Sequence, residues 1–136
     1  MIKKVFKQEH LVAIIIDFLA DFEATTFFTD KDSFLQVGLI HKESLQSVKP
    51  HRHNVFERRV LGTSEFLFVL EGKMAITIFD SDFKSPETFT LGKGSGVLLV
   101  GGSHSINFAE SAKLIEVKQG PFFAEEDKVY LTEIDS

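Results

Sequence analysis

Two histidines at positions 51 and 53 carry the clearest chemical signal in the sequence, within Pro50-His51-Arg52-His53. Side chains alternate along a β-strand, so this spacing would direct both imidazoles to one face of a sheet. Two neutral imidazoles on one face can share a divalent cation, and imidazole suits zinc, copper, iron and nickel. The pair therefore predicts part of a metal site that other side chains must complete.

A carboxylate suited to that site is Glu65, at the start of an apolar segment that ends in a turn at Gly72. Strand alternation would place Glu65 on one face with Leu67 and Val69, so the carboxylate would face a core. Buried carboxylates are rare unless they are paired, hydrogen-bonded or bound to metal. We therefore expect Glu65 to have a partner inside the fold.

A third histidine, His104, follows the turn Gly101-Gly102-Ser103. From the start of the next strand it could project inward and act as a further metal ligand. The lone histidines His10 and His41 lie on apolar segments, where no site is expected.

The elements that must position these residues read as β-strands. Apolar or β-branched segments recur at short intervals, separated by Gly, Asp and Ser turns, and no helical period lasts three turns. This pattern predicts an antiparallel sandwich, jelly roll or barrel, with one short helix over 21–28. The expected strands cover 11–18, 34–41, 66–70, 74–79, 87–91, 97–100, 104–108 and 113–118.

Composition limits the possible partners. The chain has 136 residues, enough for one core, and a formal net charge of -5, which argues against nucleic-acid and anionic-lipid partners. It has no cysteine, so any metal must bind nitrogen and oxygen ligands. The longest apolar run, 11–16, is far too short to span a membrane, and no secretory leader is evident, so we expect a cytoplasmic location.

The order of these motifs resembles the cupin superfamily. His51-x-His53, then Glu65 six residues before Gly72, then a glycine-rich loop and His104 are similar to the two cupin motifs, and the resemblance covers 36–128. The closing segment 115–122, followed by Asp127-Lys128, is similar to small single-domain cupins associated with cell-surface polysaccharide and sugar metabolism. The resemblance implies a small jelly-roll barrel in which three histidines and a glutamate hold one metal ion.

The chain departs from the common cupin spacing between its second histidine and its glutamate, because eleven residues separate His53 from Glu65. A regular hairpin turning near Gly62 would leave them roughly 20 Å apart, whereas a bulging loop would return Glu65 to the histidines. Glu57 fits the shorter spacing and is the reserve ligand. The second motif also departs, because it lacks the proline usual before its histidine.

Taken together, the sequence predicts one all-β cupin domain over 1–136, with a barrel core at about 34–120, an N-terminal strand at 11–18 and a tail at 121–136. One divalent ion (Zn, Fe, Mn or Ni) is expected on His51, His53, His104 and Glu65 or Glu57. Arg58 and Arg59 are candidate substrate-binding residues, because a guanidinium can fork onto a carboxylate or phosphate.

Three functions remain open for a small-molecule ligand at the barrel mouth. The first is a metal-dependent enzyme acting on a sugar or related metabolite, of isomerase, epimerase or dioxygenase type. The second is a metal-free enzyme resembling the cupin ketoisomerases of nucleotide sugars, in which His51 or His53 moves protons. The third is a non-catalytic sugar-binding module. A homodimer is expected, because the apolar segment 11–16 needs covering.

Overall fold

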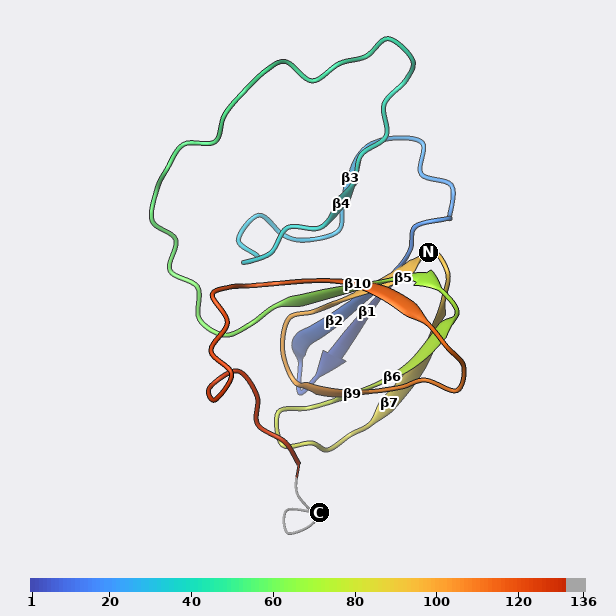
Figure 1. The fold of residues 1–136 in the computed structure, drawn as a ribbon, viewed down its shortest axis with the longest axis vertical. Helices are drawn as coiled ribbons and strands as arrows, with labels where there is room; N and C mark the ends of the chain where they lie inside the picture. The colour runs from blue at the N-terminus through green and yellow to red at the C-terminus, as the bar shows by residue number, and fades with distance from the viewer. Residues whose placement is uncertain (132–136) are drawn as a thin grey trace.

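The computed structural model describes residues 1–131 and consists of antiparallel β-sheets joined by turns and loops (Figure 1). No helix occurs within this range. The prediction of an all-β antiparallel fold is therefore confirmed. The strands are β1 (Ile2–Lys7), β2 (His10–Asp17), β3 (Thr26–Phe27), β4 (Gly38–Leu39), β5 (Glu65–Glu71), β6 (Lys73–Phe79), β7 (Glu87–Gly92), β8 (Ser95–Leu99), β9 (Ser103–Asn107) and β10 (Lys113–Lys118).

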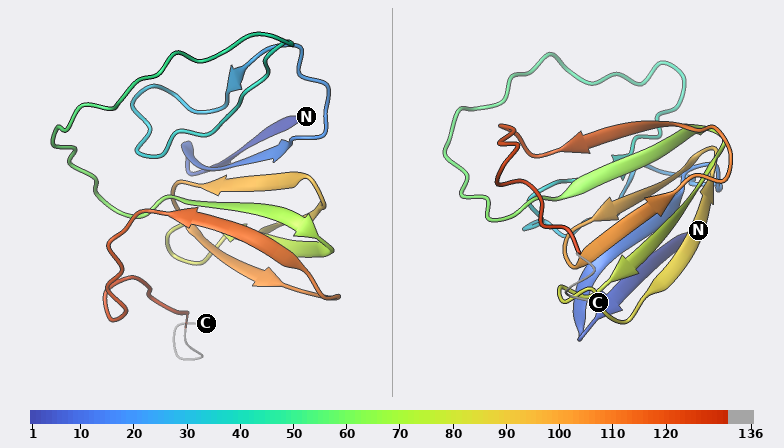
Figure 2. Two further views of the ribbon diagram at one scale, coloured as in Figure 1. Left: turned by 45° about the horizontal axis from the view of Figure 1, so that its top comes forward. Right: turned by 60° about the horizontal axis from the view of Figure 1, so that its bottom comes forward.

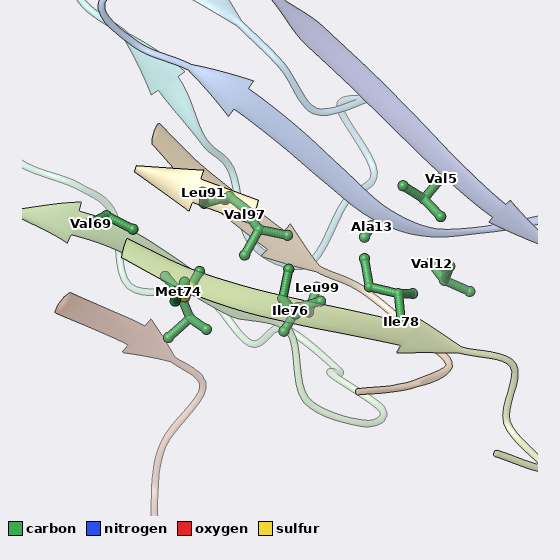
Figure 3. Packing of buried hydrophobic residues seen from close by; sticks show 11 residues of the cluster. Val5, Val12, Ala13, Val69, Met74, Ile76, Ile78, Leu91, Val97 and Leu99 are labelled. Atoms are coloured by element: carbon green, nitrogen blue, oxygen red, sulfur yellow. The ribbon is translucent and has the colours of Figure 1, made fainter. Parts of the chain in front are cut away.

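Two sheets face each other and enclose the main core (Figure 2). The larger sheet has the order β1-β2-β8-β5-β10 and the smaller sheet the order β7-β6-β9. Alternate residues of β5 and β6 point between the sheets, as the burial of Leu67, Val69, Ile76 and Ile78 shows. Val69, Ile76 and Ile78 are labelled in Figure 3. Burying an aliphatic side chain of this size contributes about 1.5–3 kcal/mol, so the alternation of each strand fixes which of its faces turns inward.

A third layer covers the opposite face of the larger sheet. This outer layer, residues 18–40, includes the short β3–β4 pair. Phe28 and Val37 of this layer are buried together with Ile14, Ile16 and Leu98 of the sheet. Strands β2 and β8 are therefore covered on both faces, which explains why their sequences are continuously apolar rather than alternating.

The structure differs from the sequence prediction within the outer layer. The expected helix over 21–28 is wrong, because this segment runs through bends into β3. Its rings pack separately: Phe18 and Phe22 each make an edge-to-face contact with Phe28, with centroids 5.6 and 5.5 Å apart. The expected strand over 34–41 is reduced to β4.

The N-terminal strand lies inside the larger sheet rather than at a free surface. Strand β2 pairs with β1 on one side and β8 on the other, and Val12, Ala13, Ile14 and Ile16 are buried within the chain itself. The apolar segment 11–16 is therefore covered by the chain itself, and the predicted dimer needs an interface at another surface. Strands β1 and β2, which precede the barrel core predicted over about 34–120, also belong to the larger sheet. Part of the predicted tail over 121–136 lies outside the described residues.

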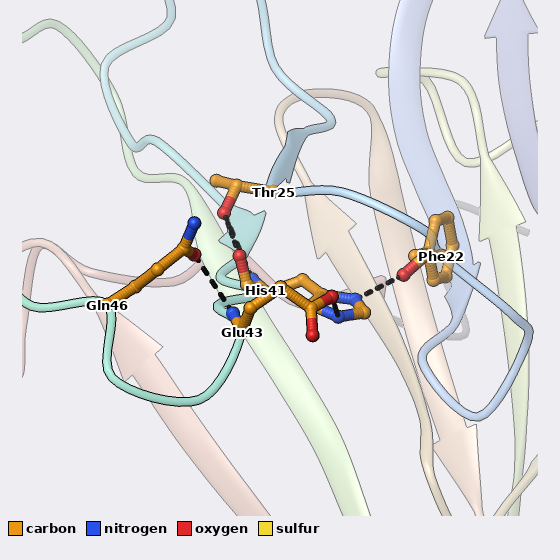
Figure 4. Close-up of polar contacts among 5 residues, drawn as sticks. All are labelled: Phe22, Thr25, His41, Glu43 and Gln46. Carbon is orange, nitrogen blue, oxygen red and sulfur yellow. Dashed lines mark hydrogen bonds and ion pairs between the residues drawn. The ribbon is translucent and has the colours of Figure 1, made fainter.

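A long irregular segment connects the outer layer to β5. We call residues 47–63 the arm; every one of them is exposed and none belongs to a strand. Before the arm, the His41 backbone N–H donates to Thr25 Oγ1 at 3.0 Å and its Nδ1 lies 2.6 Å from the Phe22 carbonyl oxygen (Figure 4). After the arm, the Ser64 N–H donates to Gln119 Oε1. The arm is therefore anchored at both ends.

Candidate functional site

The candidate site begins with Glu65, the first residue of β5. Its neighbours across the sheet are Leu99 on β8 and Lys118 on β10. As the alternation predicts, Glu65 shares the inner face with Leu67 and Val69, which are 5% and 0% exposed. Its own side chain is 17% exposed, so the carboxylate lies at the rim of the core rather than in bulk water.

His104 approaches Glu65 from the opposite sheet. It lies on β9 directly across from Ile78, whose side chain is buried between the sheets, so the imidazole also points inward. The distance from His104 Nε2 to Glu65 Oε2 is 3.7 Å. Two strands from different sheets thus bring an acid and a base together at one end of the core.

The environment shifts the pKa values of the two groups in opposite directions. Burial, followed by a hydrogen bond to Glu116 and the charge of that residue, raises the pKa of Glu65 from 4.5 to about 7, against the charges of Lys118 and Lys128. Burial also lowers the pKa of His104, as does the charge of Lys128, against the opposing effect of Glu116. The low-dielectric rim therefore favours the uncharged forms of both side chains.

A cluster of charges on β10 and the following chain completes this end of the molecule. Lys118 Nζ lies 3.6 Å from Glu116 Oε1 and 3.5 Å from Asp127 Oδ2. Partial desolvation acts to lower the pKa of Lys118, but the charges of Glu116 and Asp127 raise it overall. The ammonium also lies 5.2 Å from the centre of the Phe122 ring. These contacts hold the chain beyond β10 against the site.

The pair lines a cavity of about 710 Å³. Its other walls include Phe79, Leu99 and Tyr130, together with Lys118 and Lys128. The volume lies within the usual range of about 300–1,000 Å³ for small-molecule sites, and the mixture of apolar walls with a few polar groups is also typical. The cavity can therefore hold a metabolite of sugar size with both Glu65 and His104 in its wall.

The other predicted site residues lie elsewhere. His51 and His53 are on the exposed arm rather than on a strand, so the expectation that a sheet face aligns them is wrong. Their rings pack edge to face, with centroids 5.4 Å apart, and neither lines the cavity. Arg58 lies over the Phe56 ring at 3.7 Å. The arm also carries Glu57 and Arg59, which likewise do not line the cavity.

The side chains as placed do not form the four-ligand metal centre. Within residues 1–131, no three His, Asp or Glu side chains converge as metal ligands would. The segment between the histidines and Glu65 does form a bulging loop, but this loop holds His51 and His53 away from Glu65. Residues 47–63 have no alternating apolar face that could pack on the core. Whether a metal binds this chain stays a prediction.

Sequence reasoning missed the charged residues around the pair. Glu116 and Lys118 alternate with Leu114 on β10, and the pairing of β10 with β5 puts all three on the inner face. That period of two was visible in the sequence of 113–118, but the register that places Lys118 beside Glu65 was not. Asp127 and Lys128 reach the site through the path of the chain after β10.

Comparison of the chain with protein-family models, curated proteins and solved structures gives no match. The site is therefore interpreted from its own geometry. The described residues also contain no helix long and apolar enough to cross a membrane.

Proposed function

We propose that the chain binds a sugar or a related small carbonyl metabolite in the 710 Å³ cavity and isomerises it by proton transfer between substrate carbon and oxygen. The observation that carries this proposal is the 3.7 Å approach of Glu65 and His104 in the wall of that cavity. A pair that holds one proton donor and one acceptor side by side suits a substrate in which a carbonyl adjoins a carbon bearing a hydrogen and a hydroxyl.

Each residue has a distinct role in this reaction. Neutral His104 accepts the proton from the carbon beside the carbonyl, and the carboxylic acid of Glu65 gives a proton to the carbonyl oxygen, which yields an enediol. His104 then returns its proton to the former carbonyl carbon, and the hydroxyl on the neighbouring carbon gives its proton to Glu65 and becomes the new carbonyl. Atoms and protons balance, and no oxidant is needed.

A cupin jelly roll would be consistent with the same function. We propose that the two facing sheets are the halves of a cupin jelly roll, on the strength of the order of His51-x-His53, Glu65, Gly72 and His104. Of the family's four ligand positions, Glu65 and His104 meet while the histidine pair stays on the arm, so we route no step through a metal ion. The proposal follows the hypothesis of a metal-free isomerase, but His104 rather than His51 or His53 moves the protons.

Ligand binding and turnover can be tested separately. The first measurement is the thermal shift of the full chain with a panel of aldoses, ketoses, sugar phosphates and nucleotide sugars. The second is NMR of each binder in deuterated water, because abstraction of a proton beside a carbonyl exchanges that hydrogen for deuterium. We expect deuterium at that carbon with the unmodified chain, and at least about a hundredfold slower exchange in His104→Gln and Glu65→Gln.

Matched controls separate the site from the rest of the chain. Glu71→Gln changes the exposed end of the same strand, and His53→Gln changes a histidine on the arm; both should exchange at the unmodified rate. A ligand that binds but never exchanges would replace the enzyme with a sugar-binding module. Metal content is measured in protein purified without chelator. Stoichiometric metal that is lost in the double variant His51→Ala with His53→Ala would favour the metal-dependent enzyme instead.

A further inference from the structure

Between its two anchored ends, the arm has almost no hydrogen bonding of its backbone. Residues 47–63 form no backbone–backbone hydrogen bond to another described residue, and the Lys49 carbonyl oxygen lies 2.9 Å from His51 Nδ1 within the arm itself. Connections longer than about 12–15 residues without secondary structure are uncommon in compact domains and usually have a function. Five apolar side chains of the arm are exposed: Val48, Val55, Phe56, Val60 and Leu61. In water this segment has both unpaired backbone and uncovered apolar surface, so it is suited to docking on another surface.

The arm and the outer layer have opposite charge. The arm carries Lys49, Arg52, Arg58 and Arg59 against one acidic residue, Glu57. The outer layer, residues 18–40, carries four acidic residues against one basic residue, Lys31. All four acidic residues, Asp21, Glu23, Asp30 and Asp32, are exposed. Each surface thus carries the charges that the other lacks.

An apolar strip lies on the same side of the molecule as the outer layer. Leu70 of β5 and Ile115 and Val117 of β10 are 41%, 45% and 47% exposed. Ile115 and Val117 lie across from Phe68 and Phe66, and Phe66 packs into the core beneath the outer layer. The outer layer therefore covers the centre of the larger sheet but leaves this edge uncovered. The arm extends on that side too, away from the three-stranded sheet (Figures 1 and 2).

We propose that two copies of this chain form a dimer by exchanging arms, so that the basic, apolar arm of each copy lies on the acidic outer layer and apolar strip of the other. Arm, outer layer and strip share one side of the molecule, so a single two-fold axis satisfies both contacts at once. Anchoring at the His41 contacts and at Ser64 fixes where the arm leaves its own chain. This inference is independent of the proposed function.

Charge reversal tests the exchange directly in the full chain. One variant reverses the arm with Arg58→Glu and Arg59→Glu, and a second reverses the outer layer with Asp21→Lys and Glu23→Lys. We expect sedimentation velocity to show a dimer of the unmodified chain at micromolar concentration. In each variant alone, like charges face each other, and the dissociation constant should rise at least about tenfold. An equimolar mixture should restore a heterodimer, since each reversed surface then meets a surface of opposite charge.

The mixture distinguishes exchange between two copies from docking of the arm on its own chain. If the arm docks on its own chain, each charge reversal weakens that internal contact, and mixing the two variants gives no heterodimer. That result would overturn the proposal. A monomeric unmodified chain, or variants that dimerise as well as it does, would overturn it too. Lys84→Glu with Lys93→Glu makes the same change of net charge as the arm variant, but outside the arm and outer layer, and should leave the dimer intact. Far-UV circular dichroism checks that all variants fold.

Discussion

Replacing Glu65 with glutamine should make the protein more stable at alkaline pH but not at acid pH. The folded state holds the Glu65 proton more tightly than the unfolded state, because its pKa rises from 4.5 to about 7 on folding. Below the lower value both states are protonated, and the carboxyl has no pH-dependent effect. As the pH rises through this window the folded state must ionise a half-buried group, so stability is progressively lost.

The size of the effect follows from the shift. At 1.36 kcal/mol per pKa unit, the whole shift corresponds to about 3 kcal/mol, and access of solvent to the cavity reduces this to about 1–2 kcal/mol. Glutamine does not ionise, so the free energy of unfolding of Glu65→Gln minus that of the unmodified chain should rise by this amount between about pH 4 and pH 8.

Urea unfolding followed by far-UV circular dichroism measures this difference, since the chain has no Trp and one Tyr for fluorescence. Glu71→Gln, at the exposed end of β5 where Glu71 pairs with Lys113, is the matched control for loss of a carboxylate on the same strand, and any change that it shows is subtracted. A flat difference for Glu65→Gln, or one that falls as the pH rises, would refute the assignment of a desolvated carboxyl at this position.

Three other substitutions test separate parts of the structure. Ile76→Ala removes a fully buried side chain between the sheets and should lower the free energy of unfolding by about 2–5 kcal/mol; a loss below about 1 kcal/mol in urea unfolding would contradict the position of the core. Gly72→Ala should lower the free energy of unfolding by about 1–3 kcal/mol, because φ is 74° and a Cβ would meet the Ser111 carbonyl oxygen. The control Gly62→Ala has a similar φ of 82° but open space around it, and should lose about 1 kcal/mol. Equal losses in the two variants would argue against the close approach at Gly72. Lys118→Gln removes a charge that lowers the pKa of Glu65, so that pKa should move above about 7 in a carbon-13 NMR titration, and an unchanged value would place Lys118 too far away.

The strands that could be predicted from the sequence are those whose local signals agree. The segment 113–118 coincides with β10, and 74–79 matches β6 within a residue at its start, because alternation and flanking turn residues coincide there. Strand β1 was missed for the opposite reason. Its turn into β2 uses Gln8 and Glu9 at φ 50° and 66°, and neither residue is one that usually marks a left-handed turn.

The candidate site was partly predictable for a related reason. Glu65 and His104 stand at the starts of strands whose inward faces can be predicted from neighbouring apolar residues, so alternation predicts that both side chains point inward. Their contact depends on how the two sheets face each other, which alternation does not predict. The spacing of His51 and His53 has meaning only if the segment is a strand, and no flanking apolar alternation supports one there. Lys118 needed the long-range register between β5 and β10, which no local pattern contains.

The contact between Glu65 and His104 joins two sheets that share no backbone hydrogen bonds. Its length therefore depends on how far apart the larger and smaller sheets stand, and so does the burial that shifts the pKa of each group. Any motion that widens this end of the sandwich admits water and returns both groups toward their ordinary pKa values, because burial is the largest cause of each shift. The pKa of His104, measured by NMR titration, thus reports the spacing between the sheets. A ligand that moves the sheets apart will change this pKa before any product forms.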